Sequence, residues 1–159
     1  MNPPSRDPPS VLFVCLGNIC RSPLAQAAFA AEARRVGLIA HADSAGTGDW
    51  HVGEPPDPRA QRTARRHGVD ISGYRGRQVE RADFDRFTHI LALDHGNLAD
   101  LRRLAPADAT ARIGLLLDLV PGRAGEAVAD PYFGDEAGFE VTWDEVTAAA
   151  EALVALFGG

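Results

Sequence analysis

The sequence predicts an α/β fold in which a parallel sheet lies between two layers of helices. Short apolar runs alternate with longer helical patterns along the 159 residues, as expected of parallel strands joined by helical crossovers. The run 11–14 is apolar without alternation, which is typical of a strand covered on both faces. Two long connections rich in Gly and Pro, 46–58 and 121–138, interrupt the pattern. Loops of that length in a compact domain are usually functional.

A helix and a second strand follow the run 11–14. The helix is expected over 23–36, with Ser22 as its N-cap and Pro23 at its first position, where a missing N–H costs nothing. Its residues have high helix propensity, and Gly37 follows its last turn, as is common at helix ends. The second strand is expected over 39–45.

The second half of the chain continues the alternation. Trp143 lies at helical spacing with apolar residues of the last helix, so we expect it in the core. Together the elements predict one three-layer α/β/α domain over 11–159, with a four-stranded parallel sheet of flavodoxin-like or Rossmann-like topology. The remaining expected helices are 59–67, 97–104 and 139–157, and the remaining expected strands are 88–93 and 113–119.

Composition and charge exclude several classes of protein. The hydrophobic fraction of 45% and the charged fraction of 24% are ordinary for a globular domain. The net charge of -6 argues against a nucleic-acid partner, because such proteins need a basic surface. All 16 positive side chains are Arg, which excludes a Lys-dependent nucleotide phosphate loop. No apolar run approaches the ~20 residues that would span a membrane.

The ends of the chain and its cysteines predict a location. Residues 1–10 are rich in Pro, lack the apolar stretch of a signal peptide, and are expected to form a disordered tail. Cys15 and Cys20 are the only cysteines, which is no secreted disulfide framework. A reducing cytoplasm is therefore the expected location. The five histidines lack zinc spacing, and no metal or other cofactor is expected.

The loop between the first strand and the first helix has the residues of an anion site. Backbone N–H groups and the helix dipole attract anions at this point of α/β folds. The helix end and a nearby cation favour a thiolate, so Cys15 is the candidate nucleophile. The planar fork of Arg21 matches two phosphate oxygens. Gly17 and Asn18 tolerate left-handed backbone that turns N–H groups inward, and the Ser22 hydroxyl can donate to the thiolate.

A thiolate that displaces phosphate needs an acid to protonate the leaving oxygen. Asp130, in the second long loop, is the candidate. Pro131 fixes the backbone that follows it, and Tyr132 and Phe133 place an apolar wall beside it.

At this point the chain resembles the bacterial type of low-molecular-weight protein tyrosine phosphatase. The motifs follow that family's order, and the match covers essentially everything from 11 to 157. The motifs are CLGNICRSPLA at 15–25, SAGTGDWHVG at 44–53, DPRA at 57–60, HGVD at 67–70 and DPYFGDE at 130–136.

The resemblance implies hydrolysis of protein phosphotyrosine, an aryl phosphate monoester, through a phosphocysteine intermediate on Cys15. Arg21 and the loop would bind phosphate, and Asp130 would act as acid and then as base for the attacking water. Phosphate and other oxyanions would bind as product or inhibitor. The phosphate-binding loop so implied contains Leu16, Gly17, Asn18, Ile19, Cys20 and Ser22.

The resemblance also implies support within the loop. Asn18 would hold the strained loop through Ser44, and Ser22 would stabilise the thiolate as leaving group. Cys20 would form a reversible disulfide with Cys15 under oxidation.

The resemblance further implies an aromatic rim. Trp50, Tyr132 and Phe133 would flank the pocket and sandwich an aromatic ring, with core packing as the alternative for Trp50. Tyr74 stands where the family commonly has a His that supports the loop, so the hydrogen-bond network of the loop is expected to differ here.

Two other functions stay open. A protein arginine phosphatase would share this loop, but relatives of that type carry Thr where this chain has Ile19, and an apolar Ile suits an aryl phosphate better. A non-catalytic phosphotyrosine-binding module would use the loop without turnover, and the joint presence of Cys15, Arg21 and Asp130 argues against it. An arsenate reductase would need further cysteines for its redox relay.

Overall fold

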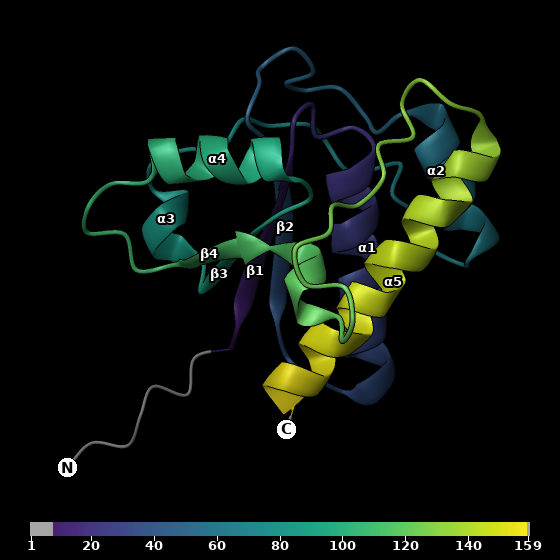
Figure 1. The fold of residues 1–159 in the computed structure, drawn as a ribbon. Coiled ribbons are helices and arrows are strands. Elements are labelled where there is room, and N and C mark those ends of the chain that lie inside the picture. Colours follow the sequence, from purple (N-terminus) through teal and green to yellow (C-terminus); the bar gives the residue numbers. More distant parts are fainter. Residues whose placement is uncertain (1–7, 159) are drawn as a thin grey trace.

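The computed structural model describes residues 8–158 and shows a parallel sheet between two layers of helices (Figure 1). The four strands lie in the order β2-β1-β3-β4, and every neighbouring pair is parallel. This confirms the predicted fold class, with the order expected of a flavodoxin-like topology. The expected disordered tail over 1–10 lies, for residues 1–7, outside the described residues, and Ser10 already belongs to β1.

The elements follow the predicted alternation with shifted boundaries. The strands are β1 (Ser10–Cys15), β2 (His41–Gly46), β3 (His89–Ala92) and β4 (Arg112–Leu115). The helices are α1 (Arg21–Val36), α2 (Pro58–Arg66), α3 (Asp83–Arg86), α4 (His95–Leu104), α5 (Glu136–Gly158) and the 3-10 helix η1 (Leu116–Leu119).

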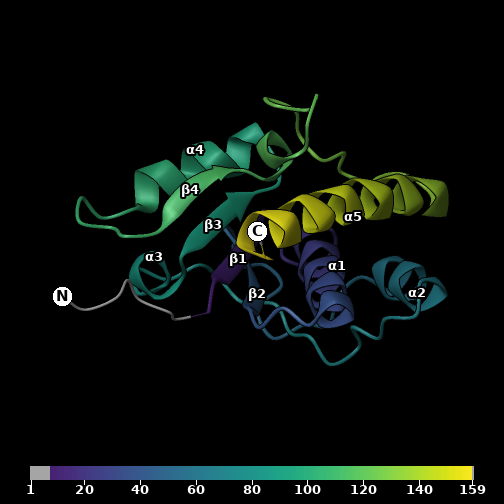
Figure 2. The same ribbon diagram turned by 90° about the horizontal axis from the view of Figure 1, so that it is seen from below.

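The central strand β1 buries both of its faces. Val11, Phe13 and Cys15 pack into a cluster with residues of α1 and α5, whereas Leu12 and Val14 pack into a second cluster with residues of α3 and α4. Figure 2 shows α1, α2 and α5 on one side of the sheet and α3 and α4 on the other. Both faces of β1 therefore need apolar side chains, which explains a run without alternation.

The expected strand 113–119 is wrong in its second half. The strand β4 ends at Leu115, and the next four residues form η1. Leu116 and Leu117 both pack into the cluster that includes α5, whereas consecutive residues of a strand point to opposite faces. A short apolar run does not distinguish these two conformations by its periodicity.

The expected N-cap of the first helix is also wrong. The helix α1 begins at Arg21, and Cys20 takes the N-cap position without a side-chain capping bond. Ser22 lies inside the helix and uses its hydroxyl elsewhere. The other end is as predicted, since Gly37 has a left-handed backbone with φ of 76°.

Two smaller differences remain. The helix α3 was missed, because four residues are too few to show a helical period, and α5 begins three residues before the expected 139. Trp143 is buried in α5, as predicted. Within the described part of the chain, no helix combines the length and the hydropathy that crossing a membrane requires.

Candidate active site

Three loops meet at the carboxyl ends of the parallel strands, at the top of Figure 1. They connect β1 to α1, β2 to α2, and η1 to α5. They line a cavity of about 200 Å³. Most of the residues predicted for the site line it, whereas Asn18, Ser22 and Ser44 are buried and do not belong to its lining. One further residue, His51, was not predicted. The lining residues are Cys15, Leu16, Gly17, Ile19, Cys20, Arg21, Trp50, His51, Asp130, Tyr132 and Phe133.

Cys15 is the last residue of β1 and is only 3% exposed. Its Sγ accepts a hydrogen bond from the backbone N–H of Asn18 at 3.3 Å and lies 3.0 Å from the Ser22 hydroxyl. The helix α1 begins six residues later. The sulfur is therefore placed where two donors and a helix amino end favour negative charge.

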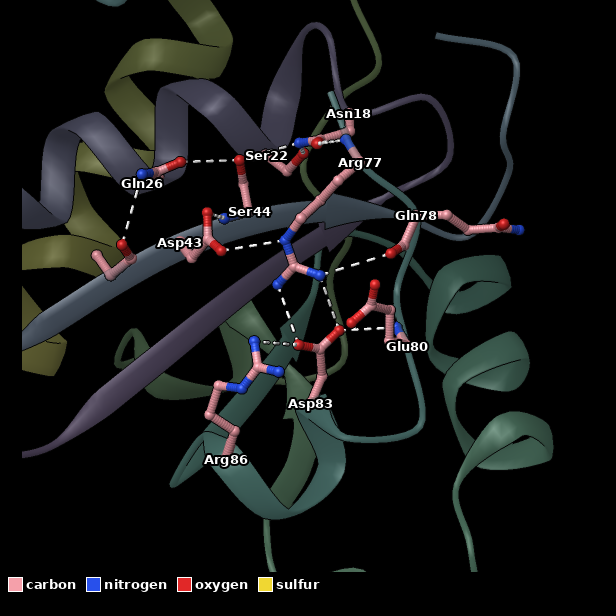
Figure 3. Close-up of polar contacts among 11 residues, drawn as sticks. Asn18, Ser22, Gln26, Asp43, Ser44, Arg77, Gln78, Glu80, Asp83 and Arg86 are labelled. Atoms are coloured by element: carbon pink, nitrogen blue, oxygen red, sulfur yellow. Dashed lines mark hydrogen bonds and ion pairs between the residues drawn. The ribbon is translucent and has the colours of Figure 1, made fainter. Parts of the chain in front are cut away.

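Asn18 is the hub of the loop (Figure 3). It is the one described non-glycine residue with positive φ, at 59°. Its Nδ2 donates to the hydroxyls of Ser22 at 2.8 Å and Ser44 at 2.9 Å, and its Oδ1 accepts from the backbone N–H of Arg77 at 3.0 Å. A backbone N–H can only donate, so Arg77 fixes which way the amide points. Ser22 then accepts from Asn18 and has its own hydrogen left for the sulfur of Cys15.

The network continues behind the loop to α1. The Ser44 hydroxyl accepts from Asn18 and donates to Oε1 of Gln26 at 2.8 Å. Gln26 donates in turn to the Ala42 carbonyl at 3.5 Å. Each hydroxyl in this chain therefore has one defined donor role. Asn18 and Ser44 are in direct contact, and the loop-supporting role expected of them stays a prediction.

A buried ion pair holds the residue that orients Asn18 (Figure 3). The guanidinium of Arg77 donates to Asp43 at 3.1 Å and to both oxygens of Asp83 at 2.9 and 3.1 Å. Asp83 is fully buried and also accepts from the Glu80 N–H at 2.7 Å. Burial alone would lower the pKa of Arg77, but the bonds and charges of Asp83 and Asp43 outweigh it and raise that pKa. The guanidinium therefore stays charged.

Arg21 is 4% exposed and is held from two sides. Its Nη1 donates to the Val128 carbonyl at 3.1 Å and pairs with Asp94 at 2.9 Å, and its Nη2 lies 3.7 Å from Asp130. Asp94 is the N-cap of α4 and accepts from the Asn97 N–H at 2.8 Å. Asp94 was not among the residues predicted for the site, although its position just after the buried strand β3 was an available signal.

The acid candidate stands at an open rim. The Asp130 side chain is 52% exposed, and its Oδ1 accepts from the Tyr132 N–H at 3.1 Å. Trp50 is 66% exposed, which rules out the core-packing alternative for it, and Phe133 is 94% exposed. The rings of Tyr132 and Phe133 meet edge to face, with centroids 4.9 Å apart. The aromatic wall therefore stands beside the carboxyl without enclosing it.

The second loop cysteine is a poor nucleophile. Cys20 is buried, and its burial, with the negative charges of Asp57 and Cys15, raises the pKa of its thiol. Both cysteines are free, and a disulfide between them stays a prediction.

Two other residues complete the surroundings of the loop. A Cβ at position 17 would lie 3.1 Å from the ring of His51, a tight contact that the histidine side chain would have to shift to relieve. His51 also lies 3.1 Å from Glu54. Tyr74 packs against the core cluster around α1 and α5, and the contact from its segment to Asn18 comes from the backbone of Arg77.

Comparisons with known proteins agree with this geometry. The sequence profile described as "Low molecular weight phosphotyrosine protein phosphatase" matches residues 10–157. A low molecular weight protein-tyrosine-phosphatase of Streptomyces coelicolor is 45% identical over 150 residues, covering 91% of each chain. The crystal structure of YfkJ from Bacillus subtilis has a TM-score of 0.88 at 41% identity and covers 97% of this chain and 98% of that one.

A second solved structure bears on the substrate. The Drosophila protein described as an arginine phosphatase has a TM-score of 0.88 at 32% identity, over 94% of this chain and 98% of its own.

Replacing Arg77 with Met should lower the free energy of unfolding by about 3–5 kcal/mol, because it leaves the buried Asp83 carboxylate without its main partner. The measurement is urea unfolding followed by circular dichroism. Arg75→Met is the matched control: Arg75 is exposed and donates to two backbone carbonyls of its own turn, so its loss should stay near 0.5 kcal/mol. Equal losses in the two variants would contradict the role given to the pair.

Proposed function

The chain belongs to the low molecular weight phosphotyrosine protein phosphatase family and is an enzyme of that class, and we propose that it hydrolyses protein phosphotyrosine through a phosphocysteine intermediate on Cys15. One observation supports this most: a single cavity is lined by a thiol, a buried guanidinium and a carboxyl, from Cys15, Arg21 and Asp130. Nucleophile, anion ligand and acid are the three groups that the reaction needs.

In the first step, the sulfur of Cys15 attacks phosphorus and the bond from phosphorus to the tyrosine oxygen breaks. Asp130 gives its proton to that oxygen, which leaves as neutral phenol with the bonding electrons. Arg21 has Nη1 occupied by Asp94 and Val128, so the edge formed by Nε and Nη2 is the one assigned to phosphate oxygens. The backbone N–H groups of the loop stabilise the charge that builds on the remaining oxygen.

In the second step, the same carboxyl works in reverse. Asp130, now ionised, takes a proton from water as the water oxygen attacks phosphorus, and the sulfur–phosphorus bond breaks. Cys15 leaves as a thiolate, stabilised by the Ser22 hydroxyl and the Asn18 N–H. Inorganic phosphate is the product, and it and similar oxyanions are the expected inhibitors. The positive charge comes from Arg21 and the loop, so the proposed reaction uses no metal or cofactor.

The rim supports an aromatic substrate. Trp50, Tyr132 and Phe133 line the opening, where their rings can pack on both faces of a phosphorylated tyrosine side chain. Ile19 adds an apolar side chain to the lining. A reducing compartment such as the cytoplasm suits the mechanism, because Cys15 must remain a thiol to react.

A protein arginine phosphatase is the second candidate, and the likeness to the Drosophila structure described by that activity favours it. Its substrate would present a charged guanidino group in place of a phenyl ring. The apolar Ile19 side chain offers such a group no hydrogen-bonding partner and packs better against a phenyl ring, so phosphotyrosine remains the proposed substrate.

Cys15→Ser should abolish turnover of a phosphotyrosine peptide and keep binding of inorganic phosphate, since Arg21 and the loop N–H groups remain. Single-turnover kinetics and calorimetric titration with phosphate measure the two properties. Turnover by the variant at the wild-type rate would refute the covalent mechanism. If the wild-type protein binds phosphate but shows no turnover, the chain is a binding module.

Asp130→Ala should lower kcat on phosphotyrosine by roughly 10²–10⁴, the usual contribution of a positioned general acid. Asp108→Ala is the control for loss of an exposed carboxylate. A change below about threefold would remove Asp130 from this role.

Purified protein should hydrolyse phosphotyrosine peptides in preference to phosphoarginine peptides of the same sequence. The measurement is phosphate release without added metal, compared as kcat/KM for the two peptides. The opposite preference would favour the arginine phosphatase.

A further inference from the structure

We propose that Arg59 is a positioning residue that sets where the Asp130 carboxyl stands relative to Cys15. The inference rests on the proposed function and adds a residue to it. Arg59 lies in the first turn of α2, and within the described residues it is absent from the lining of the cavity. Its effect must therefore pass through the loops that it contacts.

The guanidinium of Arg59 binds the loop that carries Asp130. Its Nη1 donates to the Gly134 carbonyl and its Nη2 to the Tyr132 carbonyl, both at 2.9 Å. The N–H of Tyr132 donates in turn to Oδ1 of Asp130. One residue thus has its carbonyl held by Arg59 and its N–H on the proposed acid. A shift of the guanidinium would move the carboxyl with it.

The same guanidinium is anchored to the loop that carries Cys15. Its Nε and Nη2 bind the two oxygens of Asp57, at 3.1 and 2.9 Å. The backbone N–H of Asp57 donates to the Ile19 carbonyl at 2.9 Å. Burial alone would raise the pKa of Asp57, but the hydrogen bonds and charge of Arg59 outweigh it and lower that pKa. Arg59 therefore links the nucleophile loop to the acid loop through an ionised partner.

Packing against two aromatic rings holds the planar guanidinium of Arg59 in place. The Arg59 guanidinium lies 4.8 Å from the ring centroid of Phe139, which is fully buried in α5, and 5.7 Å from that of Tyr132. A planar group with five donors can serve a carboxylate and two carbonyls at once, whereas a lysine ammonium cannot span them. The geometry thus depends on the shape of the side chain as well as on its charge.

A leaving-group comparison tests this role. Phenyl phosphate releases a phenol with a pKa of about 10, like that of tyrosine, and needs an acid to protonate it. In contrast, p-nitrophenyl phosphate releases a more stable phenolate. Arg59→Gln should lower kcat/KM on phenyl phosphate by roughly 10- to 100-fold, the scale of a catalytic group misplaced by about 1 Å. The loss on p-nitrophenyl phosphate should be several-fold smaller. This ratio is measured on one preparation and does not depend on how much of the variant folds.

Controls separate positioning from general damage. Arg35→Gln removes an exposed ion pair with Glu32 at the far end of α1 and should leave the ratio unchanged. Arg59→Lys should shift the ratio nearly as far as Arg59→Gln, and recovery of the wild-type ratio would contradict the role of the fork. The inhibition constant of inorganic phosphate should stay within about twofold of the wild-type value. A rise in that constant as large as the fall in kcat/KM would contradict the positioning role, because it would mean that the phosphate loop had collapsed.

The double variant tells the two proposals apart. If Arg59 acts through Asp130, then Arg59→Gln should cost less than about twofold in the Asp130→Ala background, because residues that act as a unit are non-additive. Multiplying losses would overturn the positioning role. If Asp130→Ala leaves the leaving-group ratio unchanged, the proposed acid itself is wrong. If it shifts the ratio and Arg59→Gln does not, only the inference about Arg59 fails.

Discussion

The structure of the site depends on the orientation of one amide, that of Asn18. Its left-handed backbone costs of order 1–2 kcal/mol for a residue with a Cβ, and three side-chain hydrogen bonds offset that cost. Reversing the amide would set its NH₂ group against the Arg77 N–H and its oxygen toward Ser22 and Ser44. The Ser22 hydroxyl would then donate its hydrogen to the amide oxygen and no longer to the sulfur of Cys15. A backbone group 59 residues downstream thus determines the hydrogen bonding around the sulfur of Cys15.

The segment around Arg77 supports two loops at once. Its backbone pairs with Gly46 at the end of β2, where N–H of Gly46 donates to the Arg77 carbonyl at 2.8 Å. At Gly76 a Cβ would lie 2.4 Å from the His51 carbonyl, so only glycine allows the loop between β2 and α2, which carries His51, to approach this segment. The buried pair with Asp83 secures this segment. A buried ion pair is weak evidence for stability in itself, and here its contribution is to place the Asn18 partner and the rim loop together.

The sequence predicted local patterns well and distant partners poorly. Strand, loop and helix around Cys15 follow from propensity, and motif resemblance named nearly every cavity residue. Asp94 and the carbonyl partners of Arg59 were missed, because those contacts join residues at least 73 positions apart. The Arg77–Asp83 pair spans only six positions and was missed because it lies in a segment without a helical or strand period. The strand predicted over 113–119 is wrong from Leu116 onward for a similar reason, since packing against α5 decides which way that side chain points.

The two loops with reacting groups are held in different ways, and the proposed reaction explains why. Cys15 and Arg21 are almost fully buried, with hydrogen-bond partners defined on several sides, so charge can develop beside dipoles that need no reorganisation. Asp130 is half exposed and held mainly through its neighbour's backbone. A carboxyl group that gives a proton to the substrate and then takes one from water must be in contact with the substrate in the first step and with solvent in the second. Enclosing Asp130 as tightly as Cys15 would exclude the water that the second step requires. The position of the Asp130 carboxyl must therefore be set by a residue outside the cavity lining, such as Arg59.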